Sequence, residues 1–261
     1  MRRILLFLLV AVITAFLSSC LTIEEHTTIR RDGSGSQVTT IDMSKMFDNP
    51  LMMMAMEEEL KKGKGEQEER IDSSFLVYEE FLPANPQWTD EERSLVLRTE
   101  GRMVMDLAAG ESAMTMSFPF QDLAELEALK SLLASANQPA SEEEGGAGGM
   151  MSGLAGKNFT TGTLVLKGKK LIRTSTVASS MDNPFEDEEL GEEGMEMVKE
   201  MFSDAVMVYT MEFPGKVKKV KGFPGHEVVG NQVIQAFDFL ELLDKPEIVD
   251  LGLSGEIKFK K

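Results

Sequence analysis

The sequence predicts an α+β fold: a curved antiparallel sheet built from hairpins, with two or three helices packed on it. Short segments with apolar residues at alternate positions are separated by glycine-containing turns, which is typical of antiparallel strands. Cap and proline signals open a few helical stretches between these segments. Because the strands come in hairpin pairs and not in a regular strand–helix alternation, the pattern disfavours a parallel α/β sheet.

The N-terminal part of the chain predicts one hairpin followed by one helix. The hairpin spans residues 21–43, with Asp32-Gly33-Ser34-Gly35 as its turn. Asp48-Asn49-Pro50 then predicts a helix over 51–62, because a polar cap followed by proline in the first turn is a common helix start.

Methionines at alternate positions indicate a second β region, with a turn near Ala109-Gly110. The alternating residues are Leu95, Leu97, Met103 and Met105 on one strand and Met114 and Met116 on the next. Because alternate residues of a strand share a face, we expect the methionines of both strands on one buried face.

A helix and a loop follow this region. Asp122 and Glu125 form a candidate capping box before a stripe of leucines, which predicts a helix over 123–133. Residues 138–157 are rich in Gly, Ser and Glu and predict a flexible loop. The remaining predicted elements are a hairpin over 159–177 with its turn at 167–170, a helix opened by Asp182-Asn183-Pro184, and strands over 205–213, 216–221, 232–239 and 251–259.

The N-terminus predicts secretion and lipid attachment. Two arginines precede residues 4–17, which are 14 residues with only Thr14 polar. This run is shorter than the ~20 apolar residues of a membrane span but fits a signal peptide. Leu17-Ser18-Ser19-Cys20 resembles the lipobox of bacterial lipoproteins, which implies removal of residues 1–19 and attachment of fatty acyl chains such as palmitate to Cys20. The alternative is an ordinary signal peptide with an incidental cysteine.

We therefore expect a signal peptide at 1–19 and a single envelope domain at 20–261. Leu21 follows the cysteine in place of the aspartate associated with inner-membrane retention in many Gram-negative lipoproteins. By this resemblance we expect the protein on the outer membrane, facing the periplasm.

Charge restricts the partners that the chain can have. The full chain has 27 basic and 44 acidic residues, and the leader holds two of the basic ones and none of the acidic ones, so the mature chain has a net charge of −19. Such a body is repelled by nucleic acid phosphates and by anionic headgroups. We expect no nucleic acid partner, and membrane attachment through the lipidated Cys20 alone.

The sequence carries no recognisable catalytic set. His26 and His226 are the only histidines and lie in no ligand-spaced cluster. Once Cys20 is lipidated, the folded body has no cysteine for a disulfide, a metal site or a nucleophile. We expect no enzyme activity, no cofactor and no metal.

The methionines are the unusual signal. Met103, Met105, Met114 and Met116 form a candidate apolar pocket, because the flexible thioether adapts to irregular lipid tails. The same spacing is also that of an ordinary buried strand face. Thioether pairs also bind Cu(I), although the histidine or cysteine that usually assists is missing here.

Several turn motifs resemble the LppM-like family of bacterial lipoproteins. They are Cys20, Asp32-Gly33-Ser34-Gly35, Phe213-Pro214-Gly215 with Val217 to Gly222, and Gly230-Asn231-Gln232-Val233 leading to Phe237. The family favours tryptophan in the last strand, where this chain has Gln235 or Phe237. The resemblance implies an α+β envelope domain, lipid binding in some members, and no established enzyme activity.

Two functions are consistent with these expectations. The first is a non-catalytic binding module for a lipid or other apolar ligand. The alternative is a structural or accessory component of an envelope protein assembly, in which the function lies in surface contacts.

Overall fold

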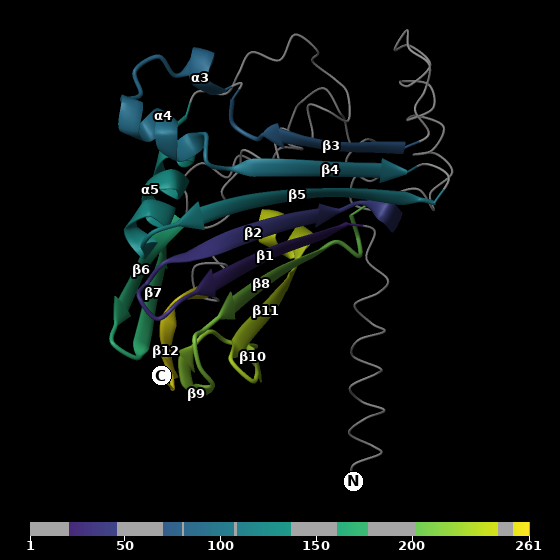
Figure 1. Ribbon diagram of the computed structural model, residues 1–261. Helices are drawn as coiled ribbons and strands as arrows, with labels where there is room; N and C mark the ends of the chain where they lie inside the picture. The colour runs from purple at the N-terminus through teal and green to yellow at the C-terminus, as the bar shows by residue number, and fades with distance from the viewer. Residues whose placement is uncertain are drawn as a thin grey trace, which may run out of the picture.

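The computed structural model describes residues 21–45, 70–79, 81–106, 109–136, 161–176, 202–244 and 253–260. These residues form two sheets and a few short helices (Figure 1). The strands are β1 (Thr22–Ile29), β2 (Gly35–Asp42), β3 (Arg70–Leu76), β4 (Glu100–Asp106), β5 (Glu111–Phe120), β6 (Thr161–Lys167), β7 (Lys170–Thr176), β8 (Val206–Glu212), β9 (Val217–Gly222), β10 (Glu227–Val229), β11 (Gln232–Asp238) and β12 (Gly255–Phe259). The helices are α3 (Phe81–Ala84), α4 (Asp90–Val96), α5 (Leu123–Ala134) and α8 (Phe239–Asp244).

The eight-stranded sheet has the order β10-β11-β8-β1-β2-β5-β4-β3, and we call it the large sheet. The four-stranded sheet has the order β6-β7-β12-β9, and we call it the small sheet. The α+β class is thus confirmed, but the prediction of a single antiparallel sheet is wrong in two respects. The strands divide between two sheets, and β1 pairs in parallel with β8. Hairpin signals are local, whereas β8 reaches β1 from the last third of the chain.

The predicted hairpins are confirmed. β1 and β2 pair along their full length around the turn that contains Gly33, whose φ of 94° is readily adopted only by glycine. The Asp32 side chain closes this turn by accepting hydrogen bonds from the backbone N and the Oγ of Ser34. β6 and β7 pair around Gly168. The four late strands are also present as β8, β9, β11 and β12.

The prediction for residues 95–97 is wrong, because Leu95 lies in α4 and not in a strand. Thr89 caps this helix, accepting a hydrogen bond from the backbone N of Glu92 while the Glu92 carboxylate accepts one from the backbone N of Thr89. This capping box outweighs the local alternation. The cap predicted for α5 is confirmed in part. Asp122 accepts from the Glu125 backbone N, but the Glu125 carboxylate reaches Gln121.

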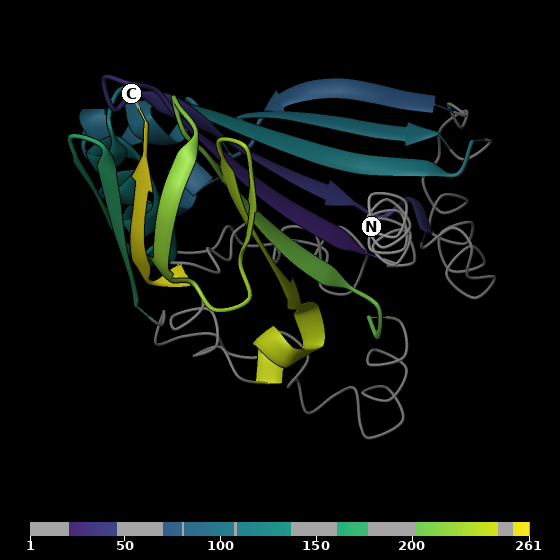
Figure 2. The same ribbon diagram turned by 90° about the horizontal axis from the view of Figure 1, so that it is seen from below.

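The main core lies between the inner face of the large sheet, α5 and the small sheet. The small sheet covers one end of the large sheet, and α5 lies beside β6 (Figures 1 and 2). Stacked rings join the two sheets, since the ring centroids of Phe213 and Phe259 are 5.0 Å apart. Leu171 and Ile257 on the small sheet are also fully buried.

Some predicted elements lie outside the described residues. They are the leader with Cys20, the helices predicted after Asp48 and Asp182, and the loop at 138–157. Within the described ranges, the helices are too short or too polar for any of them to cross a bilayer.

Candidate functional site

The strand register places the predicted methionine set on one face. Met103 lies directly opposite Met114, and Met116 lies opposite Gly101 in the same β4–β5 ladder. Met105 lies opposite Ser112, two residues along the same face. Met114 and Met116 are 5% and 7% exposed, whereas Met103 and Met105 are half-buried. The structure thus brings the four methionines together on the inner face, and the apolar pocket itself stays a prediction.

The inner face continues across the large sheet as rows of register partners. One row is apolar over most of its length and runs through Met103, Met114, Ile41, Ile23, Met207 and Phe237. The neighbouring row is mixed and runs through Gly101, Met116, Thr39, Glu25, Tyr209 and Gln235. A carboxylate therefore stands beside a long apolar strip.

Glu25 forms a buried ion pair with Lys130 of α5. The Lys130 Nζ lies 3.1 Å from Oε1 and 3.3 Å from Oε2 of Glu25. The two side chains are 11% and 13% exposed, for Lys130 and Glu25 respectively. Because water is largely excluded, the attraction between these charges is weakly screened.

Arg173 of β7 adds a second buried cation to this cluster. The residue is 7% exposed, and its Cζ lies 5.9 Å from the centroid of the Tyr209 ring. Within the described part of the chain, the guanidinium makes this cation–π contact but no hydrogen bond or ion pair. An arginine has five N–H donors, and buried donors normally have acceptors. Arg173 therefore places a planar cation with five N–H donors beside Tyr209 of the large sheet.

Burial dominates the titration of this cluster. It lowers the pKa of Lys130, with a smaller contribution from Arg173, and the Glu25 carboxylate opposes the shift. Burial likewise lowers the pKa of Arg173 and raises that of Tyr209 well above its ordinary value. Glu127, nearer the surface on α5, has a pKa raised by burial, and its carboxylate accepts a hydrogen bond from the backbone N of Leu164. We call Glu25, Lys130, Arg173 and Tyr209 the interior cluster.

The interior cluster holds two cations and one carboxylate, and a second carboxylate lies nearby. Lys130 and Arg173 both lie near Glu25, Glu127 on α5 also attracts Lys130, and the raised pKa of Tyr209 keeps its hydroxyl neutral. A buried charge is unfavourable unless an opposite charge compensates it. This arrangement can accept the anionic group of a ligand, with the apolar row beside it for a hydrocarbon part.

Sequence reasoning missed the interior cluster, although a signal was present. Glu25 alternates with Ile23 and Thr27, Lys130 interrupts the leucine stripe of α5, and Arg173 follows Leu171 at strand spacing. Each charged residue thus occupies a core-facing position of an apolar pattern. Three such exceptions in one chain indicate a polar interior site.

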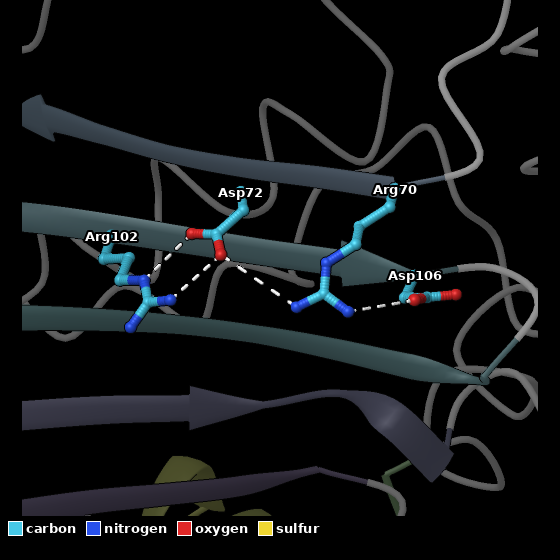
Figure 3. A network of polar contacts seen from close by, with 4 residues as sticks. All are labelled: Arg70, Asp72, Arg102 and Asp106. Carbon is cyan, nitrogen blue, oxygen red and sulfur yellow. Dashed lines mark hydrogen bonds and ion pairs between the residues drawn. The ribbon is translucent and has the colours of Figure 1, made fainter.

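The outer face of the large sheet carries a different network, on β3 and β4 (Figure 3). Arg102 binds Asp72 through two hydrogen bonds of 2.9 Å, and Arg70 lies 3.3 Å from Asp106 and 4.0 Å from Asp72. The hydrogen bond from Arg102 lowers the pKa of Asp72. Arg70, Asp72 and Arg102 are exposed and Asp106 is partly buried, so solvent screens most of this network and we assign it a role in strand pairing only.

Two open surface hollows lie among the described residues. One lies on the outer face of β3, β4 and β5, beside Ser74, Arg102 and Thr115. The other lies between α4 and α5 and is lined by acidic side chains such as Glu91 and Asp122. None of the four methionines and no member of the interior cluster lines either hollow.

The histidines lie apart from the interior cluster. His26 points to the outer side of β1, where its Nε2 lies 3.1 Å from Oε2 of Glu212. His226 lies in the turn before β10, with Nδ1 2.6 Å from the carbonyl oxygen of Phe223. Cys20 lies outside the described residues, directly before Leu21, which is fully buried.

Comparison with known proteins gave one structural similarity. No protein-family model matches the chain, and no curated protein matches it by sequence. Among solved structures, the chain is similar to the NMR structure of the folded domain of LppM from Mycobacterium tuberculosis. The match has 13% sequence identity and a TM-score of 0.35, and it covers 93% of this chain and 92% of that domain.

Proposed function

We propose that this protein is a lipid-anchored envelope lipoprotein whose body is a non-catalytic binding module for a lipid or other apolar ligand with an anionic group. The observation that carries the proposal is the contiguity of the inner-face apolar row with the interior cluster. The hydrocarbon part of the ligand would lie along Met103 and Met114, and the anionic group would meet Arg173.

The chemistry of both parts supports this assignment. Methionine side chains are flexible and polarizable, so they adapt to the irregular contour of an acyl chain. The planar guanidinium of arginine suits a carboxylate or phosphate, which can accept two parallel hydrogen bonds. A ligand anion would also compensate the buried charge of Arg173.

The anchor would be the acyl chains on Cys20. Leu21 is buried and β1 begins at Thr22, so there is almost no tether between Cys20 and the folded body. The body would therefore be held at the membrane surface, where its ligand is abundant. An outer-membrane location facing the periplasm is part of this proposal.

The test is native mass spectrometry and lipid extraction of the protein purified from a bacterial envelope fraction. We expect a stoichiometric lipid with the wild-type protein, and its loss in Arg173→Gln. The matched control is Arg102→Gln, which removes the same charge on the exposed outer face and should retain the lipid. Arg173→Gln removes a buried cation that forms no ion pair within the described residues, and thermal unfolding of the variant checks that it folds.

A clean mass without ligand, and no rise in melting temperature on adding lipids, would contradict the binding module. The accessory role in an envelope assembly would then be favoured, and crosslinking of the anchored protein would identify the partner.

A further inference from the structure

The outer face of the small sheet carries a row of four lysines, one on each strand. The register pairs Lys167 with Lys170, Lys170 with Lys258, and Lys258 with Lys219. We call these four residues the lysine row. Lys167, Lys219 and Lys258 are exposed, and Lys170 is half-buried. Like charges directly opposite one another destabilise a sheet, so this arrangement is unfavourable without an anionic partner.

The residues around the row strengthen its charge. Lys169, Lys216, Lys218, Lys221 and Lys260 are also exposed on the small sheet and its turns. Glu256 is the one acidic residue of these segments, and it lies among the lysines, 3.1 Å from Lys170. The lysines lower the pKa of Glu256, with the hydrogen bond from Lys170 as the largest cause.

The charge of this face is opposite to that of the rest of the protein. Residues 161–176, 216–222 and 255–260 hold ten of the 27 basic residues and one of the 44 acidic ones; nine of the ten are lysines, and the tenth is the buried Arg173. The other residues hold 17 basic and 43 acidic residues, a net charge of −26. The molecule is therefore strongly polarised, and an anionic surface would attract it in one orientation only.

We propose that the outer face of the small sheet is a docking surface for an anionic phospholipid bilayer. The lysines extend over a face of roughly 15 by 20 Å, from strand spacing and rise, and so match charge spread in two dimensions. A linear polyanion would contact only part of such a face. The cations of this face are all lysines. A lysine acts as a point charge toward many phosphates, whereas an arginine would bind one phosphate or carboxylate through two parallel hydrogen bonds.

The docking surface lies away from the N-terminal end of the fold. β1 starts at Thr22 and runs with β8 toward the end of the large sheet where β9 and β12 lie (Figure 1). At that end, a Cβ on Gly33 would lie 3.9 Å from Leu166 of β6, and the backbone N of Lys260 donates to the carbonyl oxygen of Lys216. Leu21 lies at the other end of β1, so the docking surface is separate from the point where the chain leaves for Cys20.

The test uses the full protein, purified in detergent and reconstituted in nanodiscs of neutral phosphatidylcholine. Fluorescent protein-free vesicles are then offered, made of phosphatidylcholine alone or with 30% phosphatidylglycerol. We expect capture of the anionic vesicles only, and its loss when the salt is raised to 0.5 M. Lys219→Gln with Lys258→Gln should weaken capture about tenfold or more, because each lysine near an anionic surface contributes substantially.

A matched control removes two positive charges elsewhere. Lys45→Gln with Arg70→Gln changes residues at the opposite end of the large sheet, and it should leave capture within twofold of wild type. Absence of capture of anionic vesicles, or equal capture by the wild type and the lysine variant, would overturn the proposal. Binding of soluble polyphosphate without capture of vesicles would also overturn it, in favour of a linear polyanion.

Discussion

The Nζ of Lys130 on α5 lies 3.1 Å from Oε1 of Glu25 on β1, and both side chains are largely shielded from water. This ion pair joins the one long helix of the described residues to the centre of the large sheet. A buried pair of this kind is worth little relative to apolar residues of the same shape, but either charge alone is strongly unfavourable. The losses of stability caused by replacing Glu25 and by replacing Lys130 are therefore not additive.

Lys130→Met should lower the free energy of unfolding by about 3–5 kcal/mol, because it leaves the Glu25 carboxylate buried without its partner. Glu25→Gln with Lys130→Met should be clearly more stable than the sum of the two single changes predicts. Urea unfolding of the four proteins measures the coupling. Additive losses would show that the pair is effectively exposed in solution.

Gly35→Ala should destabilise the protein by about 3 kcal/mol or more, since overpacking a closed site forces the backbone to shift. A Cβ at Gly35 would lie 1.9 Å from the carbonyl oxygen of Thr28 and 2.6 Å from Cζ of Phe120. Gly33→Ala is the comparison. A Cβ at Gly33 would contact only Leu166, at 3.9 Å, so its cost comes from the positive φ of 94°. Its loss should be about 1–2 kcal/mol, the strain of a left-handed alanine. Thermal unfolding of both variants ranks the two effects.

The methionines should divide into a structural and a ligand-contacting pair. Met114→Ala removes a side chain that is 5% exposed and should cost about 2–5 kcal/mol of stability. Met103→Ala, at a half-buried position opposite it, should cost less than ~1.5 kcal/mol, because only part of its surface is removed from water. The same Met103 variant should lose most of the rise in melting temperature that a bound lipid gives. If Met103→Ala keeps that rise in full, the apolar row is ordinary core.

Glu212 should contribute stability that disappears in acid. Its carboxylate accepts hydrogen bonds from Gln232 and Asn231 and lies beside His26, and the bond from Gln232 is the largest cause of its lowered pKa. A carboxyl with a lowered folded-state pKa stabilises the fold above its unfolded pKa of about 4.3 and loses that contribution as pH falls through the folded value. Glu212→Gln should therefore be less stable than wild type at pH 7 and indistinguishable from it near pH 2. Urea unfolding across this range tests the sign, with Glu227→Gln as an exposed control.

Local signals made about half of the fold predictable. The turns at Gly33, Gly110 and Gly168 are specified by residues that adopt positive φ, so the three hairpins around them could be read from the chain. The parallel pairing of β1 with β8 and the joining of β7, β12 and β9 could not, because they depend on packing between distant segments. Leu95 shows the limit of periodicity, since the capping box of Thr89 and Glu92 makes this segment a helix despite the strand-like alternation of its leucines.

The surfaces and the interior cluster also divide into features set by local sequence patterns and features that depend on contacts between distant segments. The methionine face is a local pattern and could be predicted, whereas Glu25, Lys130 and Arg173 come together from three distant elements. Net charge alone indicated repulsion from every anionic surface. The structure shows that a chain of net charge −17 has one strongly basic face, because sheet pairing gathers lysines from three separate segments.

Neutralising the lysine row should stabilise the fold while it weakens docking. Lys219 and Lys258 are register partners on adjacent strands, and a directly opposed like-charge pair costs about 0.2–1 kcal/mol. Lys219→Gln with Lys258→Gln should thus raise the free energy of unfolding by that amount at low salt. The gain should vanish at 0.5 M salt, where the repulsion is screened. Chemical unfolding at two ionic strengths measures both values. A stability loss at low salt would mean that the lysines are already paired within the protein, and the row would then have no free charge to offer a bilayer.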